Sequence, residues 1–133
     1  MMNLQGSWVA MPTPFTEDNQ VDIEGFKLLI ARQIKYGTNQ LFILGSAGEV
    51  TLLSIEEKKL IVKSVIAYMK DRAARGLKVV PVFFSAASFT TEASVEFAQF
   101  CEAEGADRVV FTVPPYVLIT QHAAKTHLDT CMS

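Results

Sequence analysis

Hydrophobic and polar positions alternate along the chain in blocks that predict strands and helices in turn. Short apolar runs are separated by longer segments in which apolar residues recur at helical spacing. A short continuous run predicts a buried strand, whereas a period near 3.6 predicts an amphipathic helix. The strands predicted in this way are Trp8–Met11, Leu41–Leu44, Val79–Phe84 and Arg108–Thr112.

The predicted helices begin at residues that cap helices. Asp22 precedes the first helical segment and Gly37 follows it, as an N-cap and a C-terminal stop respectively. Ser54 and Glu57 form a capping box, in which a hydroxyl is followed three residues later by a carboxylate. The remaining helices are predicted from Thr90 or Thr91 to Gly105 and from Gln121 to Ser133.

Two segments depart from this regular pattern. Asp71–Gly76 is polar and predicts a linker between the second helix and the third strand. Pro81 lies inside the third predicted strand, where a proline cannot donate to the hydrogen-bond ladder. Such a proline is tolerable where it stands next to a bulge in a barrel strand.

The order of elements is strand, helix, four times over, which predicts a parallel sheet with right-handed crossovers. An open doubly wound sheet and half of a (β/α)8 barrel both fit, and a whole barrel needs about 250 residues. The strands end in small, hydroxyl or proline residues, and Asp107 lies before the fourth strand, at the wrong end for a phosphoacceptor. We expect an α/β fold in a single domain spanning residues 1–133.

The strongest candidate for a functional site is the loop that follows Leu41–Leu44. Gly45–Glu49 is a run of small residues at the carboxyl end of a strand, where ligands bind in α/β proteins. Ser46 adds a hydroxyl, and backbone amides in such a turn can form a nest for an anion. The loop predicts a pocket for a small carboxylate or phosphate, although a turn alone explains its composition equally well. It matches neither a P-loop nor GxGxxG, which disfavours nucleotides.

Composition excludes several classes of protein. A net charge of −2 argues against a nucleic-acid-binding surface, which would carry a basic excess. Cys101 and Cys131 are too few for a disulfide framework, so we expect reduced thiols and a cytoplasmic location. The amino terminus lacks the positive start and apolar core of a secretion signal. No apolar run approaches the roughly 20 residues that span a membrane.

Taken together, the motifs resemble one family. Gly45–Glu49 resembles the G-[ST]-[TA]-G-E motif of the dihydrodipicolinate synthase / N-acetylneuraminate lyase family. Gly6–Phe15, Leu53–Lys58 and Pro114-Pro115-Tyr116 agree with further motifs of that family, so the resemblance covers essentially the whole chain. It implies the first four βα units of a TIM barrel, in a family whose chains are longer than this one.

The resemblance also implies a reaction. Members are class I aldolases and lyases, in which a lysine forms a Schiff base with a 2-keto acid such as pyruvate, without a metal or other cofactor. It places Gly45, Ser46, Ala47 and Gly48 at the carboxylate of that acid, and it makes Ser46 and Tyr116 the candidate catalytic residues. Full-length members are usually oligomers, so we expect a homo-oligomer.

Two departures from the family pattern change these expectations. Ala47 stands at the family's second hydroxyl position, and Val117 stands where the synthase branch has a second tyrosine, which favours an aldolase or hydratase-aldolase branch. The family's Schiff-base lysine lies on a later strand, and we expect this chain alone to be inactive. Its own lysines fall on predicted helices or at the amino end of a strand: Lys27, Lys35, Lys58, Lys59, Lys63, Lys70, Lys78 and Lys125.

Other interpretations remain open. The half-barrel is alternatively a self-associating scaffold or a small-anion binding module without catalysis, and a flavodoxin-like nucleotide domain is a distant third. Ser85 and Ser88 are candidate pocket residues, and Glu49 is expected to fix the loop. The remaining candidates are His122 and His127, which lie five positions apart and so do not share a helix face as metal ligands would; we expect both to be solvated or lightly packed.

Overall fold

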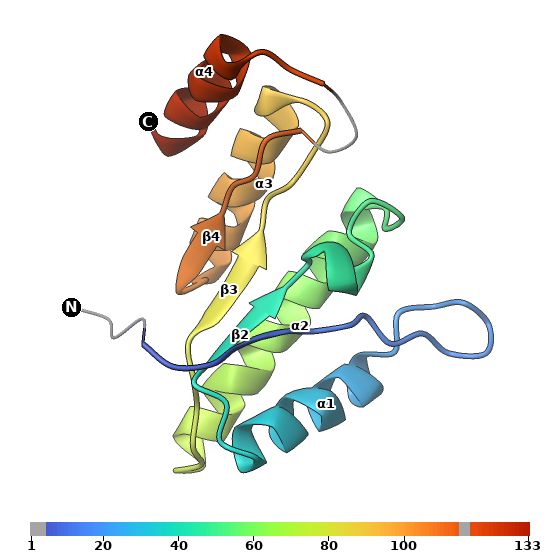
Figure 1. The fold of residues 1–133 in the computed structure, drawn as a ribbon. Coiled ribbons are helices and arrows are strands. Elements are labelled where there is room, and N and C mark those ends of the chain that lie inside the picture. Colours follow the sequence, from blue (N-terminus) through green and yellow to red (C-terminus); the bar gives the residue numbers. More distant parts are fainter. Residues whose placement is uncertain (1–4, 115–117) are drawn as a thin grey trace.

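The computed structural model describes residues 5–114 and 118–133. Strands and helices alternate along the chain, and four parallel strands form one sheet in the order β1-β2-β3-β4 (Figure 1). The prediction of an α/β fold made of four βα units is therefore confirmed. The elements are β1 (Trp8–Ala10), α1 (Ile23–Lys35), β2 (Gln40–Ile43), a single 3-10 turn η1 (Ser46–Gly48), α2 (Ile55–Ala74), β3 (Val82–Ser85), α3 (Thr91–Glu104), β4 (Arg108–Val110) and α4 (Gln121–Met132).

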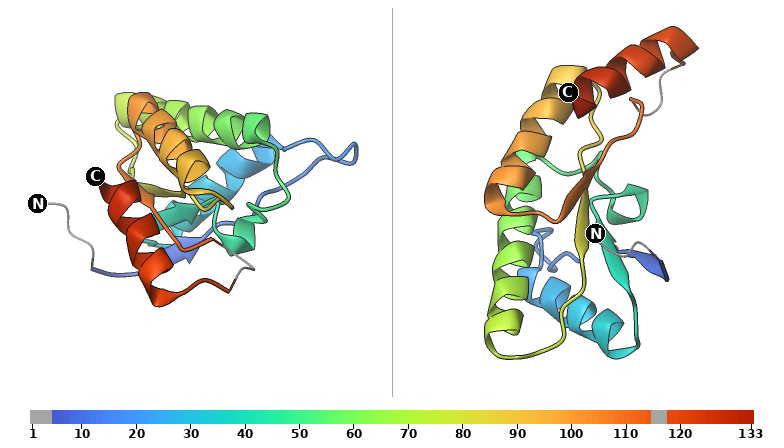
Figure 2. Two further views of the ribbon diagram at one scale, coloured as in Figure 1. Left: turned by 90° about the horizontal axis from the view of Figure 1, so that it is seen from above. Right: turned by 90° about the vertical axis from the view of Figure 1, so that its left-hand side faces the viewer.

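The two faces of the sheet differ in their cover. Helices α1, α2 and α3 lie along one face, and α4 lies across the end of α3 (Figures 1 and 2). Leu41, Ile43 and Phe84 are fully buried among residues of α2 such as Ile61 and Val65. Burying a side chain of this size stabilises the fold by about 1.5–3 kcal/mol. The core thus lies between the sheet and the helices, and no described helix covers the opposite face.

The predicted helix starts are confirmed by their hydrogen bonds. The carboxylate of Asp22 accepts from the amide of Gly25 at 2.9 Å. The amide of Ser54 donates to Glu57 at 2.7 Å and the amide of Glu57 donates to the Ser54 hydroxyl at 3.2 Å, which completes the capping box. Thr90, rather than Thr91, caps α3. These contacts are local in sequence, which is why the pattern of residues could predict them.

The predicted linker Asp71–Gly76 was wrong for most of its length, since α2 continues to Ala74. Arg75 pairs with Asp71 at 3.3 Å across one helical turn, and the Arg72 guanidinium donates to the Lys78 carbonyl. Arginine and alanine favour helices, so polarity alone did not mark a linker. The helix ends where Gly76 adopts a φ of +68°.

Strands β1, β3 and β4 are shorter than predicted, and β2 has the predicted length but lies one residue earlier. Strand β3 begins at Val82, so Pro81 stands just before it and no bulge is needed. The Pro81 carbonyl still accepts from the Leu41 amide at 3.0 Å. Strand β2 ends at Ile43 because Leu44 turns into the left-handed region with a φ of +61°. The ends of these strands therefore depend on backbone conformation and strand pairing, and they do not coincide with the ends of the apolar runs.

His127 is buried, and the prediction of a lightly packed side chain was wrong for it. Its Nδ1 lies 2.8 Å from the Thr91 hydroxyl, and its Nε2 lies 3.1 Å from the Thr112 carbonyl. The imidazole therefore connects α4 through hydrogen bonds to the start of α3 and to the segment after β4. His122, in contrast, is exposed.

Two further properties bear on the class of protein. Cys101 is buried in the core, and this burial raises the pKa of its thiol to about 12. Among the helices that the structure describes, none is both long enough and apolar enough to cross a membrane.

Candidate functional site at the strand ends

A cavity of about 230 Å³ lies at the carboxyl ends of β2, β3 and β4. Half of the residues that line it carry hydroxyl groups, and none of them is charged. An anion bound there would be held by neutral hydrogen-bond donors. The lining residues are Phe42, Gly45, Ser46, Val50, Thr51, Ser85, Ala87 and Thr112.

The turn η1 presents Ser46 to this cavity. The Gly48 amide donates to the Gly45 carbonyl at 3.0 Å, and the Glu49 amide donates to the Ser46 carbonyl at 3.1 Å. In residues 5–114 and 118–133, no hydrogen bond engages the amides of Ser46 or Ala47. Ser46 is also exposed, so its hydroxyl and these two amides can bind a ligand.

The backbone on both sides of the turn is strained. Leu44 has a φ of +61° and Glu49 a φ of +56°, although neither is a glycine. A left-handed conformation costs roughly 1–2 kcal/mol in such residues. Strain of this kind concentrates at functional sites, where the surrounding structure maintains it. Leu44, which is fully buried, is held by the core.

The two glycines of the turn are required because there is no room for a Cβ, and neither has a backbone conformation that only glycine adopts. Gly45 has a φ of −79°, which is open to any residue. A Cβ at Gly45 would lie 2.6 Å from a ring carbon of Phe42, and one at Gly48 would lie 3.1 Å from the Met11 carbonyl oxygen. Both glycines therefore let the turn pack closely against neighbouring residues.

Thr13 contacts the end of the turn at Gly48, and the sequence did not identify Thr13 as a site residue. Its buried hydroxyl donates to the Gly48 carbonyl at 2.7 Å. Thr13 and Gly48 are far apart in sequence, so no local pattern connects them. The place of Thr13 between Pro12 and Pro14 was the one available signal, since prolines make this segment rigid.

The structure brings some of the predicted site residues together. Gly45 and Ser46 line the cavity. Ala47 is exposed and Gly48 is buried behind the turn, and neither is among the lining residues. Tyr116 lies outside the described residues. The binding and catalytic roles of these residues remain predictions.

Two other predicted residues can also be placed. Ser85 lines the cavity, whereas Ser88 does not. Glu49 is exposed and ends the turn, with its backbone amide bonded to the Ser46 carbonyl.

None of the lysines lines the cavity. Burial lowers the pKa of Lys58, a direction that favours the neutral amine needed by a nucleophile. Lys58 nevertheless lies in the first turns of α2, outside the lining set. In the part of the chain that the structure describes, no group of three or more His, Cys, Asp or Glu side chains could hold a metal ion.

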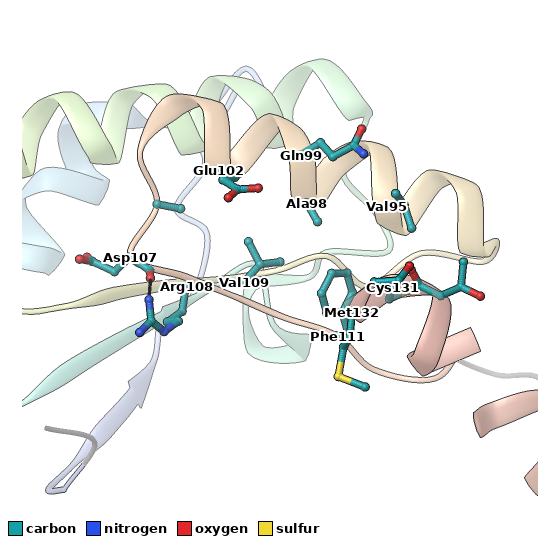
Figure 3. A pocket seen from close by; sticks show the side chains of 13 residues that line it. Val95, Ala98, Gln99, Glu102, Asp107, Arg108, Val109, Phe111, Cys131 and Met132 are labelled. Carbon is teal, nitrogen blue, oxygen red and sulfur yellow. Dashed lines mark hydrogen bonds between the residues drawn. The ribbon is translucent and has the colours of Figure 1, made fainter. Parts of the chain in front are cut away.

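A larger hollow of about 640 Å³ lies elsewhere, between α3, β4 and the end of α4 (Figure 3). It is lined by apolar residues such as Val109 and by charged ones such as Glu102 and Arg108. The Arg108 guanidinium donates to the Asp107 carbonyl at 2.8 Å. This hollow follows the flank of β4 and not the strand ends, so the smaller cavity is the candidate functional site.

Four successive βα units with a hydroxyl-lined cavity at the carboxyl edge define part of a TIM barrel. The chain belongs to the dihydrodipicolinate synthetase family, which it matches over residues 3–133. This confirms the resemblance found in the sequence.

Curated relatives of this chain are 4-hydroxy-tetrahydrodipicolinate synthases. That of Clostridium perfringens is 33% identical over 125 residues, which are 94% of this chain and 40% of the relative. That of Bradyrhizobium diazoefficiens is 37% identical over 123 residues, which are 92% of this chain and 39% of the relative. The chain therefore spans about 40% of the length of the curated relatives it matches.

Solved structures agree with the fold. YagE, a prophage protein of E. coli K12 in this family solved in complex with pyruvate, superposes with a TM-score of 0.85 at 30% identity, over 96% of this chain and 41% of its own. The Acinetobacter baumannii dihydrodipicolinate synthase, also complexed with pyruvate, superposes with a TM-score of 0.86 at 28% identity, over 98% of this chain and 42% of its own. The chain thus corresponds to part of a barrel.

Proposed function

We propose that this chain forms the carboxylate-binding part of the site of a pyruvate-dependent class I aldolase or lyase. The observation that supports this most strongly is the position of Ser46, on a turn whose amides are available and which faces a cavity at the strand ends. Membership of the family and the pyruvate complexes of two structural neighbours support the same choice of ligand.

The proposed chemistry needs two parts. A neutral lysine attacks the ketone of the 2-keto acid, and the resulting protonated imine withdraws electrons while a carbon–carbon bond forms or breaks. The acid must be held by its carboxylate during these steps. The hydroxyl of Ser46 and the amides of Ser46 and Ala47 supply donors for it. We assign Ser46 and Tyr116 to proton transfer, and the imine makes a metal or organic cofactor unnecessary.

The amine itself comes from a lysine outside these residues. Seven of the eight lysines of the chain lie on α1, α2 or α4, and Lys78 precedes β3. None of them reaches the cavity lining. We therefore assign binding, but not imine formation, to this chain alone.

Reduction with borohydride in the presence of pyruvate tests this division. Mass spectrometry should find no covalent adduct on the chain, while calorimetry should detect pyruvate binding that Ser46→Ala weakens and Ser88→Ala leaves unchanged. A stable adduct would show that one of the eight lysines forms the imine. Absence of pyruvate binding would contradict the proposed function.

A second candidate function is self-association of the half-barrel, and one feature favours it. Within the described sheet, β1 and β4 are edge strands, and Trp8 on β1 is 43% exposed. Unpaired edges favour pairing with another chain. Two copies joined β1 to β4 would close a ring of eight parallel strands, so we propose a homo-oligomer.

Light scattering at several protein concentrations distinguishes the two states. A dimer that Trp8→Lys dissociates would support closure of the ring, and a monomer at all concentrations would contradict it.

We also propose a cytoplasmic location, because Cys101 and Cys131 are both free thiols.

A further inference from the structure

Ser85 is a buried polar residue at the carboxyl end of β3. The residue is only 2% exposed, and it lines the same cavity as Ser46. Phe83, two residues earlier, packs its ring against Trp8 with centroids 4.3 Å apart. Because side chains alternate along a strand, Ser85 shares the face of Phe83, away from the helices that cover Phe84.

The register of the sheet brings Ser85 beside the turn. Ile43 pairs with Phe84, so the next positions, Leu44 and Ser85, lie side by side where the two strands end. Neighbouring strands are about 4.8 Å apart. A ligand as small as pyruvate can therefore contact the turn after β2 and the hydroxyl on β3 at the same time.

The hydrogen bonds of Ser85 leave its proton available. The Ala87 amide donates to the Ser85 hydroxyl oxygen at 3.2 Å. A hydroxyl can donate one proton as well as accept, and the described part of the chain provides no acceptor for this one. A buried donor without an acceptor is unfavourable, and an anion in the cavity would supply one.

We propose that Ser85 is a further ligand-binding residue, which donates a hydrogen bond to the second carboxylate oxygen of the 2-keto acid whose first oxygen binds at the Ser46 turn. This rests on the proposed function of the cavity. Ala47 contributes no hydroxyl to the turn, so Ser85 supplies the second side-chain donor from the neighbouring strand. The bond lies within an uncharged cavity, where neutral donors alone hold the anion.

Calorimetry with pyruvate and propionate tests the assignment. Ser85→Ala and Ser85→Cys should each weaken pyruvate binding about tenfold, since a hydrogen bond to a charged group is lost. The cysteine variant keeps the volume and has only a weak donor, so it separates hydrogen bonding from packing. Propionate has the carboxylate but no ketone, and its binding should weaken equally. The control Ser88→Ala should leave both affinities unchanged.

The outcomes separate this proposal from the one on which it rests. If the unsubstituted chain binds no pyruvate, the proposed function fails. If it binds and Ser85→Ala or Ser85→Cys binds equally well, only the role of Ser85 fails. A loss confined to pyruvate would place the contact at the ketone and overturn the assigned oxygen. Equal weakening by Ser88→Ala would show that the loop merely needs its structure.

Discussion

The amino ends and the carboxyl ends of the strands carry similar polar side chains in different surroundings. These two ends are called the amino edge and the carboxyl edge of the sheet. At the amino edge, the Ser7 amide donates to Asn39 Oδ1 at 2.9 Å, and the Asn39 amide donates to the Ser7 hydroxyl at 3.2 Å. Asp107 accepts from the Val82 amide at 2.9 Å. At the carboxyl edge, Ser46 and Ser85 face a cavity instead.

Residues of one type therefore stand in two different surroundings. Polar groups at the amino edge complete hydrogen bonds of the protein itself, which stabilises the fold. Hydroxyls at the carboxyl edge line a cavity, next to a backbone that is strained at Leu44 and Glu49, and the proposed function makes them donors to a ligand. In TIM barrels the amino edge generally serves stability and the carboxyl edge serves catalysis. Substitutions at the two edges should therefore affect different measurements.

The largest effect on stability is expected at the amino edge. Asp107→Ala leaves the partly buried Val82 amide without its acceptor, so the free energy of unfolding should fall by about 1–3 kcal/mol. Urea denaturation measures this, and Asp107→Asn, which keeps an acceptor oxygen, is the control. Pyruvate affinity should stay the same in both variants. A tenfold loss of affinity in Asp107→Ala would remove the distinction between the edges.

Thr13→Val tests a hydrogen bond that is expected to affect both stability and pyruvate binding. It should lower the free energy of unfolding by about 1–2 kcal/mol, because the Gly48 carbonyl loses its buried donor. Pyruvate binding should weaken as well, since the turn that carries Ser46 loses its support. Thr13→Ser keeps the hydroxyl and should retain most of both properties. Normal binding in Thr13→Val would show that the turn holds its shape without this bond.

The capping box at the start of α2 gives a smaller, pH-dependent effect on stability. Hydrogen bonds from the Ser54 backbone and side chain lower the pKa of Glu57 below its ordinary value of 4.5. The ionised form is favoured in the folded chain, so its contribution to stability is present above pH 4.5 and is lost as the pH falls through the lowered pKa. The difference between the native chain and Glu57→Gln should therefore shrink in denaturation experiments below pH 4.5. A constant difference at all pH values would contradict this.

Ser46→Ala should have the smallest effect on stability and a clear effect on binding. Ser46 is exposed, so we expect the free energy of unfolding to change by less than about 0.5 kcal/mol. Pyruvate affinity should nevertheless fall, because the carboxylate loses a donor. A variant that binds normally but is destabilised would place Ser46 with the residues of the amino edge.

The sequence was sufficient for features that depend on neighbouring residues. The caps at Asp22 and Ser54, the order of the elements and the turn after β2 follow from local patterns, and all are present. Features that depend on contacts between distant segments were missed. The burial of His127 needs Thr91 and Thr112.

The candidate site shows the same division. Position at a strand end was enough to select Ser46 and Ser85 as cavity residues. The bond from Thr13 to Gly48 joins segments far apart in sequence, and the prolines beside Thr13 do not predict its partner. The left-handed conformation of Leu44 could not be predicted from the sequence either, because leucine does not favour it.

The most direct test of the account follows backbone amides by NMR while pyruvate is added to the chain. We predict that the amide signals of Ser46 and Ala47 shift with pyruvate concentration, while those of Ser7 and Asn39 stay in place. Signals that do not move at the turn, or that move chiefly at the amino edge, would contradict the claim that the turn after β2 holds the carboxylate.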